Sequence, residues 1–232
     1  MTELGREQAK RTGERLAELL LKNGQTDSVI MRVSNLARAK ETADIIAPYL
    51  SSSVTQTPPD ARLNEGRPCH NIPCRMNVSP RTIKAVDDGH ERIEQAFQSY
   101  FYRHTAPPSP TIEDTILDTN VSNNDTKIEN KKMEDMPNES SVKKKEEIKP
   151  DPTPSPKHEY EIIVCHANVI RYFTCRALQI PPEAWLRLCI FNCSLTYLTI
   201  RPTGTVSCRL LGDIGHLDYP QITFSNHYGF NW

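Results

Sequence analysis

Three residues that are far apart in this sequence have side chains suited to handling a phosphate ester. His166 follows the apolar run Tyr160–Cys165 where a helix is expected to begin, which is the usual ligand position of an open α/β sheet. Arg38 stands early in another expected helix, and a guanidinium group binds phosphate oxygens in a bidentate manner. Glu65 lies in an irregular stretch, where a partly desolvated carboxyl group can donate a proton to a leaving alcohol. The three together predict an anion site at one edge of a sheet.

Each of these residues also has a simpler interpretation. An isolated histidine at such a place more often only caps the helix, and an isolated arginine is more often a surface charge. Exposed glutamates on loops usually have no role. The prediction therefore depends on all three residues lying together at one site.

The apolar pattern predicts strands that alternate with helices. Helical spacing follows Thr2, a suitable N-cap, and ends at Asn23-Gly24, while residues 51–87 show little periodicity. The expected helices cover about residues 2–22, 39–50, 88–102 and 169–178, and the expected strands cover 29–33, 160–165, 194–200 and 206–211. Because crossover helices join parallel strands, the sequence predicts an α/β fold with a central parallel strand at 160–165.

The domain is interrupted by a polar insertion. Apolar residues nearly vanish from 105 to 158, so we expect this segment to be disordered. Its run Lys143–Lys145 fits a solvated tract better than a docking patch. A single domain is thus predicted from residues 1–104 and 159–215. For the C-terminal tail, residues 216–232, packing of its aromatic side chains on a partner subunit and lack of structure are both open.

Composition excludes several classes of partner. The 232-residue chain has a formal net charge of −1, which gives no overall attraction to nucleic acid or anionic lipid. Its seven cysteines are an odd number and lie mostly in apolar runs, as expected of reduced thiols in an intracellular protein. Cys69, His70 and Cys74 have no second ligand pair, so no metal is expected. No apolar stretch is long enough to span a bilayer, so the chain as written is expected to be soluble.

Four short motifs identify a family. They are Thr2–Ala9 (TELGREQA), Ser34–Thr42 (SNLARAKET), Leu63–Gly66 (LNEG) and Cys165–Asn168 (CHAN). In content and order they resemble the phosphoglycerate mutase branch of the histidine phosphatase superfamily. Further motifs, at residues 166–172, 175–179, 181–188 and 211–213, resemble the mitochondrial serine/threonine-protein phosphatases of that family. The likeness covers most of residues 1–104 and 159–215.

The resemblance implies a three-layer sandwich with a mostly parallel central sheet, and it implies roles for four residues. Arg38 and Asn168 would bind the phosphoryl oxygens, His166 would bind and stabilise the transferring group, and Glu65 would be the catalytic proton donor. The family's nucleophilic histidine, in an Arg-His-Gly motif that closes the first strand, is absent from this chain. That strand is expected to be missing too, and Arg103-His104 cannot replace the motif because Thr105 follows it. No cofactor is implied.

The expected function is that of a protein serine/threonine phosphatase acting through a phosphohistidine intermediate, impaired in the chain as given. One alternative is a catalytically inactive phosphate- or protein-binding module, and a second is a small-molecule phosphatase or mutase. The resemblance also suggests phosphorylated protein substrates, protein kinases as partners and a homo-oligomer. It suggests a mitochondrial location, with outer-membrane association if an anchor lies upstream.

Overall fold

Three parallel strands form the central sheet of the computed structural model, which describes residues 1–22, 29–50, 54–70, 80–102 and 159–224. The strand order is β2 (Val54–Gln56), β1 (Val29–Val33), β3 (Tyr160–Val164). β1 pairs in parallel with both neighbours, with Val29 opposite Val54 on one side and Tyr160 on the other. The predicted parallel α/β architecture is thus confirmed. The predicted insertion lies outside the described residues.

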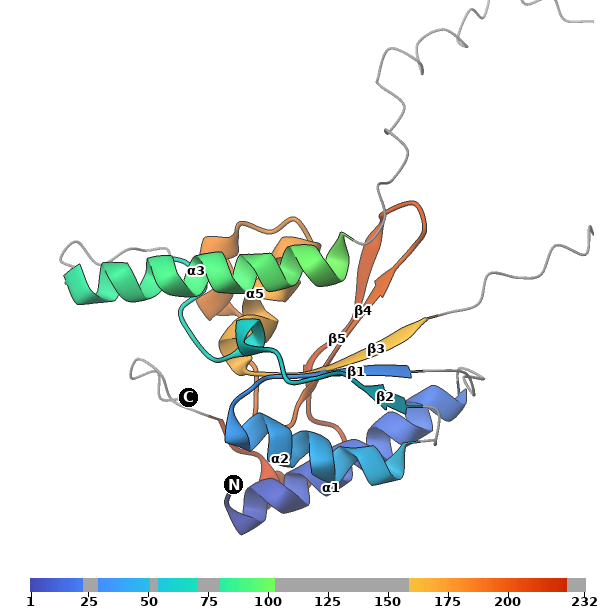
Figure 1. Ribbon diagram of the computed structural model, residues 1–232. Helices are drawn as coiled ribbons and strands as arrows, with labels where there is room; N and C mark the ends of the chain where they lie inside the picture. The colour runs from blue at the N-terminus through green and yellow to red at the C-terminus, as the bar shows by residue number, and fades with distance from the viewer. Residues whose placement is uncertain (23–28, 51–53, 71–79, 103–158, 225–232) are drawn as a thin grey trace, which may run out of the picture. The chain divides into compact units, whose positions relative to one another are not determined.

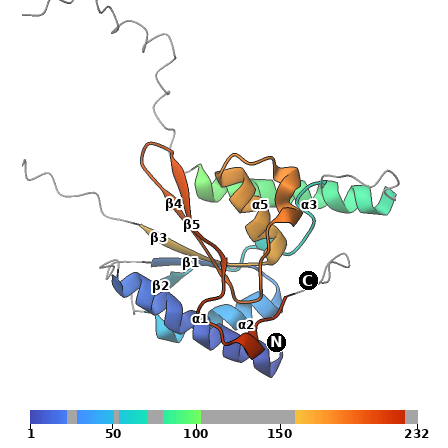
Figure 2. The ribbon, with the colours of Figure 1, turned by 180° about the vertical axis from the view of Figure 1, so that it is seen from behind.

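Helices cover both faces of this sheet. Figures 1 and 2 show α1 (Glu3–Lys22) and α2 (Ala37–Ile46) on one face, and α3 (Pro80–Phe101) and α5 (Ala167–Ala177) on the other. As predicted, Thr2 caps α1, because its hydroxyl oxygen accepts a hydrogen bond from the Gly5 amide at 3.1 Å. Of the helices in these ranges, none has the length and apolar character needed to cross a membrane.

Two apolar clusters hold the layers together, one on each face of the sheet. Side chains on β3 point alternately to the two faces, so Ile162 and Val164 join the α2 side while Ile163 and Cys165 join the α3 side. The first cluster is built around Met31, Val33, Ala39, Ala43, Ile46, Leu50 and Val164. The second is built around Leu63, Ile93, Ala96, Phe97, Tyr100, Val169, Tyr172 and Phe173. Together they fix the strand ends from which the candidate site is formed.

The strand predicted to be central lies at an edge of the sheet. Among the described strands β3 pairs with β1 alone, and its residues 160–163 are only partly buried. The predicted hairpin exists as β4 (Leu195–Ile200) and β5 (Val206–Asp213), but it forms a separate two-stranded antiparallel sheet. No described strand fills the position beside β3.

Three short 3-10 turns complete the part near the site and the C-terminus: η2 (Ala61–Leu63), η3 (Pro182–Arg187) and η4 (Tyr219–Gln221), while η1 (Ala47–Tyr49) extends α2. Part of the predicted tail is attached to the domain. The Asn192 amide donates to the Thr223 carbonyl at 2.9 Å, and Phe224 meets Phe191 edge to face with ring centroids 5.8 Å apart. Phe224 therefore contacts its own chain although 41% of it is exposed, and Tyr219 is 88% exposed. The other tail aromatics, Tyr228, Phe230 and Trp232, lie outside the described residues.

Candidate active site

His166 and Arg38 meet at the carboxyl ends of two adjacent parallel strands. His166 lies two residues after the end of β3 and is the N-cap residue of α5, while Arg38 lies in the first turn of α2, after β1. The Arg38 Nε–H group donates a hydrogen bond to His166 Nδ1 at 3.2 Å. The carboxyl ends of parallel strands are where open α/β sheets bind ligands. The predicted proximity of these two residues is therefore present in the structure.

The hydrogen bonds around His166 determine which ring nitrogen carries the proton. The Asn35 amide donates to Asn64 Oδ1 at 3.0 Å, so this atom of Asn64 is an acceptor. Ser34 therefore donates its hydroxyl proton to Asn64 Oδ1 at 2.8 Å, and its oxygen is left to accept from His166 Nε2 at 2.8 Å. The His166 ring is consequently protonated on Nε2, and its Nδ1 lone pair faces Arg38.

The surroundings of His166 favour the neutral ring. Its side chain is buried, with 6% of the residue exposed. Burial, together with the positive charges of Arg38 and Arg92, lowers the pKa of His166 from 6.5 to about 4. At neutral pH it is thus an uncharged ring that accepts from Arg38 rather than a fixed cation. An anion bound at Nδ1 would have to bring a proton to that nitrogen.

Arg38 presents an exposed guanidinium edge. The residue is exposed although its Nε is engaged. Within the described part of the chain, its two terminal nitrogens make no hydrogen bond or ion pair. Four N–H groups are therefore available to an oxyanion, the arrangement that suits bidentate binding of a phosphoryl group.

The residues on either side of Glu65 connect it to the same cluster. On one side Asn64 accepts from Ser34, the hydrogen-bond partner of His166. On the other side the Asn168 Nδ2 group donates to the Gly66 carbonyl at 3.1 Å. Glu65 is partly buried, and its Oε1 accepts from the Gly66 amide at 3.2 Å. The segment carrying Glu65 thus lies against the Arg38–His166 pair, although its role as a proton donor stays a prediction.

Asn168 links the segment that carries Glu65 to α5 by hydrogen bonds. Its Oδ1 accepts from Arg171 Nη1 at 2.9 Å while its Nδ2 binds the Gly66 carbonyl. Arg171 in turn donates to the Leu188 carbonyl at 2.8 Å. A phosphate contact from Asn168, as predicted, would have to use the second proton on Nδ2.

Sequence reasoning missed Ser34, Asn64 and Arg92 in this site. Ser34 and Asn64 were quoted within motifs but given no role, since polar residues after a strand or in a loop are common in turns. Arg92 was given no role either. Each has a partner far away in the sequence, which local patterns do not show.

The environment of Cys69, one of the possible zinc ligands, does not favour metal binding. Cys69 packs against the second apolar cluster, and burial raises the pKa of its thiol to about 12, which disfavours the thiolate that metals bind. Cys74 lies outside the described residues. Within the described ranges, no three His, Cys, Asp or Glu side chains gather as a metal site would require.

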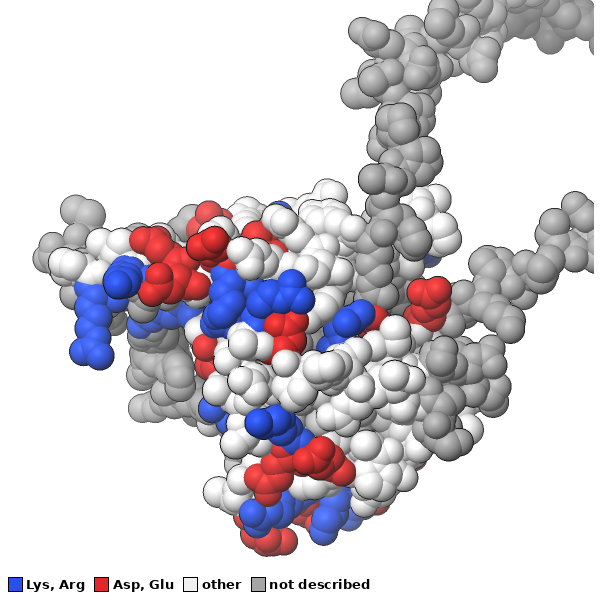
Figure 3. Space-filling model, viewed as in Figure 1, with Lys and Arg blue, Asp and Glu red and all other residues white. Residues whose placement is uncertain are grey.

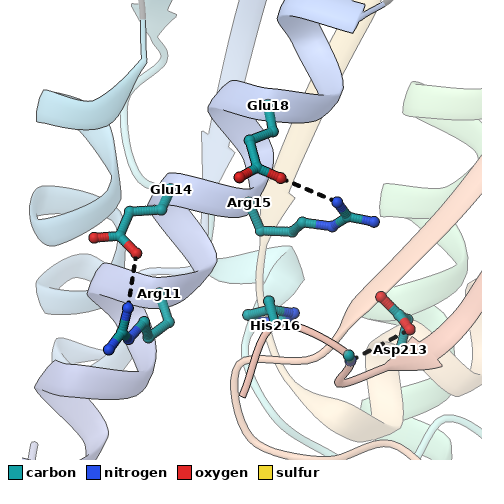
Figure 4. A pocket seen from close by; sticks show the side chains of 7 residues that line it. Arg11, Glu14, Arg15, Glu18, Asp213 and His216 are labelled. Atoms are coloured by element: carbon teal, nitrogen blue, oxygen red, sulfur yellow. Dashed lines mark hydrogen bonds and ion pairs between the residues drawn. The ribbon is translucent and has the colours of Figure 1, made fainter. Parts of the chain in front are cut away.

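A separate cavity of about 390 Å³ lies between α1 and the end of the β4–β5 hairpin (Figure 4). It shares no residue with the His166 cluster. Its lining residues are Arg11, Glu14, Arg15, Glu18, Asp213, Gly215 and His216.

The arginines of this cavity are paired with carboxylates of their own helix. Arg11 Nη1 lies 3.4 Å from Glu14, and Arg15 Nη1 lies 3.1 Å from Glu18. They therefore offer less net positive charge to a phosphate than Arg38 does. Figure 3 likewise shows basic and acidic side chains interspersed on the face in view, so anion binding has to depend on a local cluster.

Known proteins that are similar to this chain include phosphatases. The model of the histidine phosphatase superfamily (branch 1) matches residues 1–67 and 153–213. Among curated proteins, the mitochondrial serine/threonine-protein phosphatase Pgam5 of Caenorhabditis briggsae is 37% identical over 97% of this chain. The human protein of the same name, PGAM5, is also 37% identical over 97%. The chain spans about three fifths of the length of these relatives, 60% and 59%.

A solved structure also has this fold. The product of an open reading frame of Mycobacterium tuberculosis is 16% identical, with a TM-score of 0.51 over 93% of this chain and 86% of its own. The resemblance predicted from the motifs is confirmed by the family match and the sequence relatives. The chain therefore belongs to branch 1 of the histidine phosphatase superfamily.

Proposed function

We propose that this chain carries the phosphate-binding and proton-donating residues of a phosphatase that acts on serine and threonine phosphates of proteins. The observation that carries the proposal is the contact between Arg38 Nε and His166 Nδ1 at the carboxyl ends of β1 and β3. The printed names of the sequence relatives support the substrate class.

In the proposed reaction, a histidine nitrogen attacks phosphorus and the bond to the ester oxygen breaks. Glu65 gives its proton to the leaving oxygen, and water then hydrolyses the phosphohistidine. The terminal N–H groups of Arg38 would stabilise the negative charge on the transferring group, and His166 would do so through Nδ1 once the bound phosphate group brings a proton to that nitrogen. The sequence contains no Arg-His-Gly, so these 232 residues hold no counterpart of the family's nucleophile motif. We therefore expect phosphate binding with impaired turnover.

Isothermal titration of the chain with a phosphoserine peptide tests the binding claim. Arg38→Ala should weaken binding by about tenfold or more, because a charged hydrogen-bonding partner of the phosphate is lost. Arg209→Ala removes another exposed arginine, from β5, and should leave affinity unchanged. Equal affinity of the parent protein and Arg38→Ala would reject the site.

The missing motif favours a second candidate, a module that binds phosphate or protein partners without turnover. Phosphate release from a phosphoserine peptide and from phosphoglycerate separates the possibilities. Measurable release from the peptide supports the phosphatase, and release only from phosphoglycerate supports a small-molecule enzyme. Binding with no release from either supports the module and contradicts residual catalysis.

The location and partners are also proposals. The relatives are named as mitochondrial, and we infer the same compartment for this protein, with outer-membrane association if a longer form carries an anchor. Phosphorylated proteins are the expected partners, and protein kinases and a second copy of the chain follow from the family resemblance alone. Fractionation of the endogenous protein and its sedimentation coefficient test these points, and a cytosolic monomer would refute both location and oligomer.

A further inference from the structure

Arg92 holds the segment that carries Glu65 by its backbone. From α3 its Nη1 group donates to the carbonyl oxygens of Ala61, Arg62 and Asn64 at 3.1, 2.9 and 2.8 Å, and Nη2 reaches the Glu65 carbonyl at 3.3 Å. These carbonyls belong to η2 and the residues after it, and the Ala61 carbonyl also accepts from the Asn64 amide within the turn at 3.1 Å. A planar guanidinium with fixed N–H directions can serve several acceptors at once, which an ammonium group does less well.

The contact between α3 and this segment is close. A Cβ atom added at Gly66 would lie 2.6 Å from Arg92 Nη2, and one added at Gly89 would lie 2.3 Å from the Arg67 carbonyl oxygen. At Gly89 the close atom belongs to the backbone, so there is no room for a side chain, whereas a side chain at Gly66 would displace the Arg92 guanidinium. Residues 66 and 67 are thus fitted against α3, in addition to the hydrogen bonds that Arg92 makes to the residues before Glu65.

Arg92 is also linked to the His166 ring. The Asn64 carbonyl binds Arg92, and the Asn64 side chain accepts from Ser34, whose oxygen accepts from His166 Nε2. The cationic groups that act on the ring are Arg38 from α2 and Arg92 from α3, and both favour its neutral form. On the β3 side the neighbour is Cys165, whose buried thiol has a pKa raised to about 12 and so stays uncharged.

We infer that Arg92 is a positioning residue of this site: it holds the backbone of residues 61–65 so that Glu65 and Asn64 face the Arg38–His166 pair, and through Asn64 and Ser34 it fixes the hydrogen bonding of the His166 ring. The inference rests on the proposed function for its meaning, since it assigns Arg92 to placing the proton donor and the phosphate-binding ring. Arg92 itself does not touch the reacting atoms.

Nuclear magnetic resonance of the full chain tests this without requiring catalysis. Arg92→Met removes both the charge and the hydrogen bonds, so the pKa of His166 should rise. Amide hydrogen exchange at Glu65 and Gly66 should become faster by about tenfold or more, as expected when hydrogen bonds from a charged donor are lost. Arg92→Lys keeps the charge, so exchange should quicken while the pKa of His166 stays near its parent value. Arg81→Met is the control, because it removes an exposed arginine from the same helix.

The outcomes separate this inference from the proposed function. An unchanged His166 titration in Arg92→Met would show that Arg92 only supports the fold and would overturn the inference. If Arg92→Met does not fold, unchanged exchange at residues 65–66 in Arg92→Lys would overturn it instead. Failure of the proposed function would appear elsewhere, as phosphopeptide affinity that does not depend on Arg38.

Discussion

When the pH is lowered from 7 to 4.5, His166→Gln should lose much less free energy of unfolding than the parent protein. The native ring is buried, and burial with the charges of Arg38 and Arg92 lowers its pKa from 6.5 to about 4. In the unfolded chain the same histidine takes up a proton near pH 6.5. Between these pH values the unfolded state binds more protons, so the free energy of unfolding rises with pH and falls as pH is lowered through this window.

The size of the effect follows from the two pKa values. Lowering from 6.5 to about 4 corresponds to a loss of about 2.5 kcal/mol of unfolding free energy between pH 7 and pH 4.5. That is a large share of the roughly 5–15 kcal/mol by which domains are stable. In His166→Gln the amide Nε2–H can still donate toward Ser34, but no group at this position gains a proton.

Urea unfolding followed by circular dichroism at pH 7 and pH 4.5 measures the difference. Carboxyl groups contribute to the drop in both proteins, so the quantity of interest is how much smaller the drop is in His166→Gln. The exposed His70, replaced by Gln, is the matched control and should retain the full drop. If His166→Gln loses as much stability as the parent protein, the buried neutral ring is refuted.

Three further changes test the packing around the site. Glu94→Gln should lower the free energy of unfolding at pH 7 by about 2 kcal/mol, since this carboxylate accepts hydrogen bonds from an arginine and a tyrosine of α5. Although burial alone would raise the pKa of Glu94, these bonds lower it to about 2, so urea melts should show its stabilisation above pH 4.5 and lose it as pH falls toward 2. Gly89→Ala should cost roughly 2 kcal/mol in the same assay because the added methyl group meets the Arg67 carbonyl at 2.3 Å, and an unchanged midpoint would contradict that close approach. Ser34→Ala removes the acceptor of the His166 Nε2–H group while Arg38 still donates to Nδ1, so the ¹⁵N shift of Nε2 should change, and unaltered imidazole ¹⁵N shifts would argue against the hydrogen-bond chain.

Sequence patterns identified the elements that position the site but not all their limits. The strands at 29–33 and 160–164 are short apolar runs bounded by polar residues, and both were predicted. β2 was missed because three residues, Val54–Gln56, show no period. α3 begins at Pro80 rather than near Asp88, since Ile83, Ala85 and Val86 alone were too few to show a helical period in its first two turns.

Which strands lie beside β3 could not be predicted from its own sequence, because it depends on long-range pairing. An apolar run such as Tyr160–Cys165 indicates a strand covered on both faces, and this reading is correct. The pattern does not tell which strand, if any, lies along each edge. Pairing along an edge is decided by segments elsewhere in the chain.

The site was predictable where residue chemistry and strand position coincide. Arg38 and His166 each follow an apolar strand, so their meeting at one sheet edge could be expected. The tautomer of His166 could not be predicted, because it depends on Asn64, which lies about a hundred residues away in sequence. The hydrogen bonds from Arg92 could not be predicted either, because their acceptors are backbone carbonyls, which no side-chain pattern reveals.

The central claim is that Arg38 and His166 bind a phosphoryl group, and a crystal of this chain grown with phosphate tests it most directly. The account predicts phosphate density within hydrogen-bond distance of the terminal nitrogens of Arg38 and of His166 Nδ1. Density confined to other surfaces, such as the cavity lined by Arg11 and Arg15, would contradict it, as would an empty site at saturating phosphate.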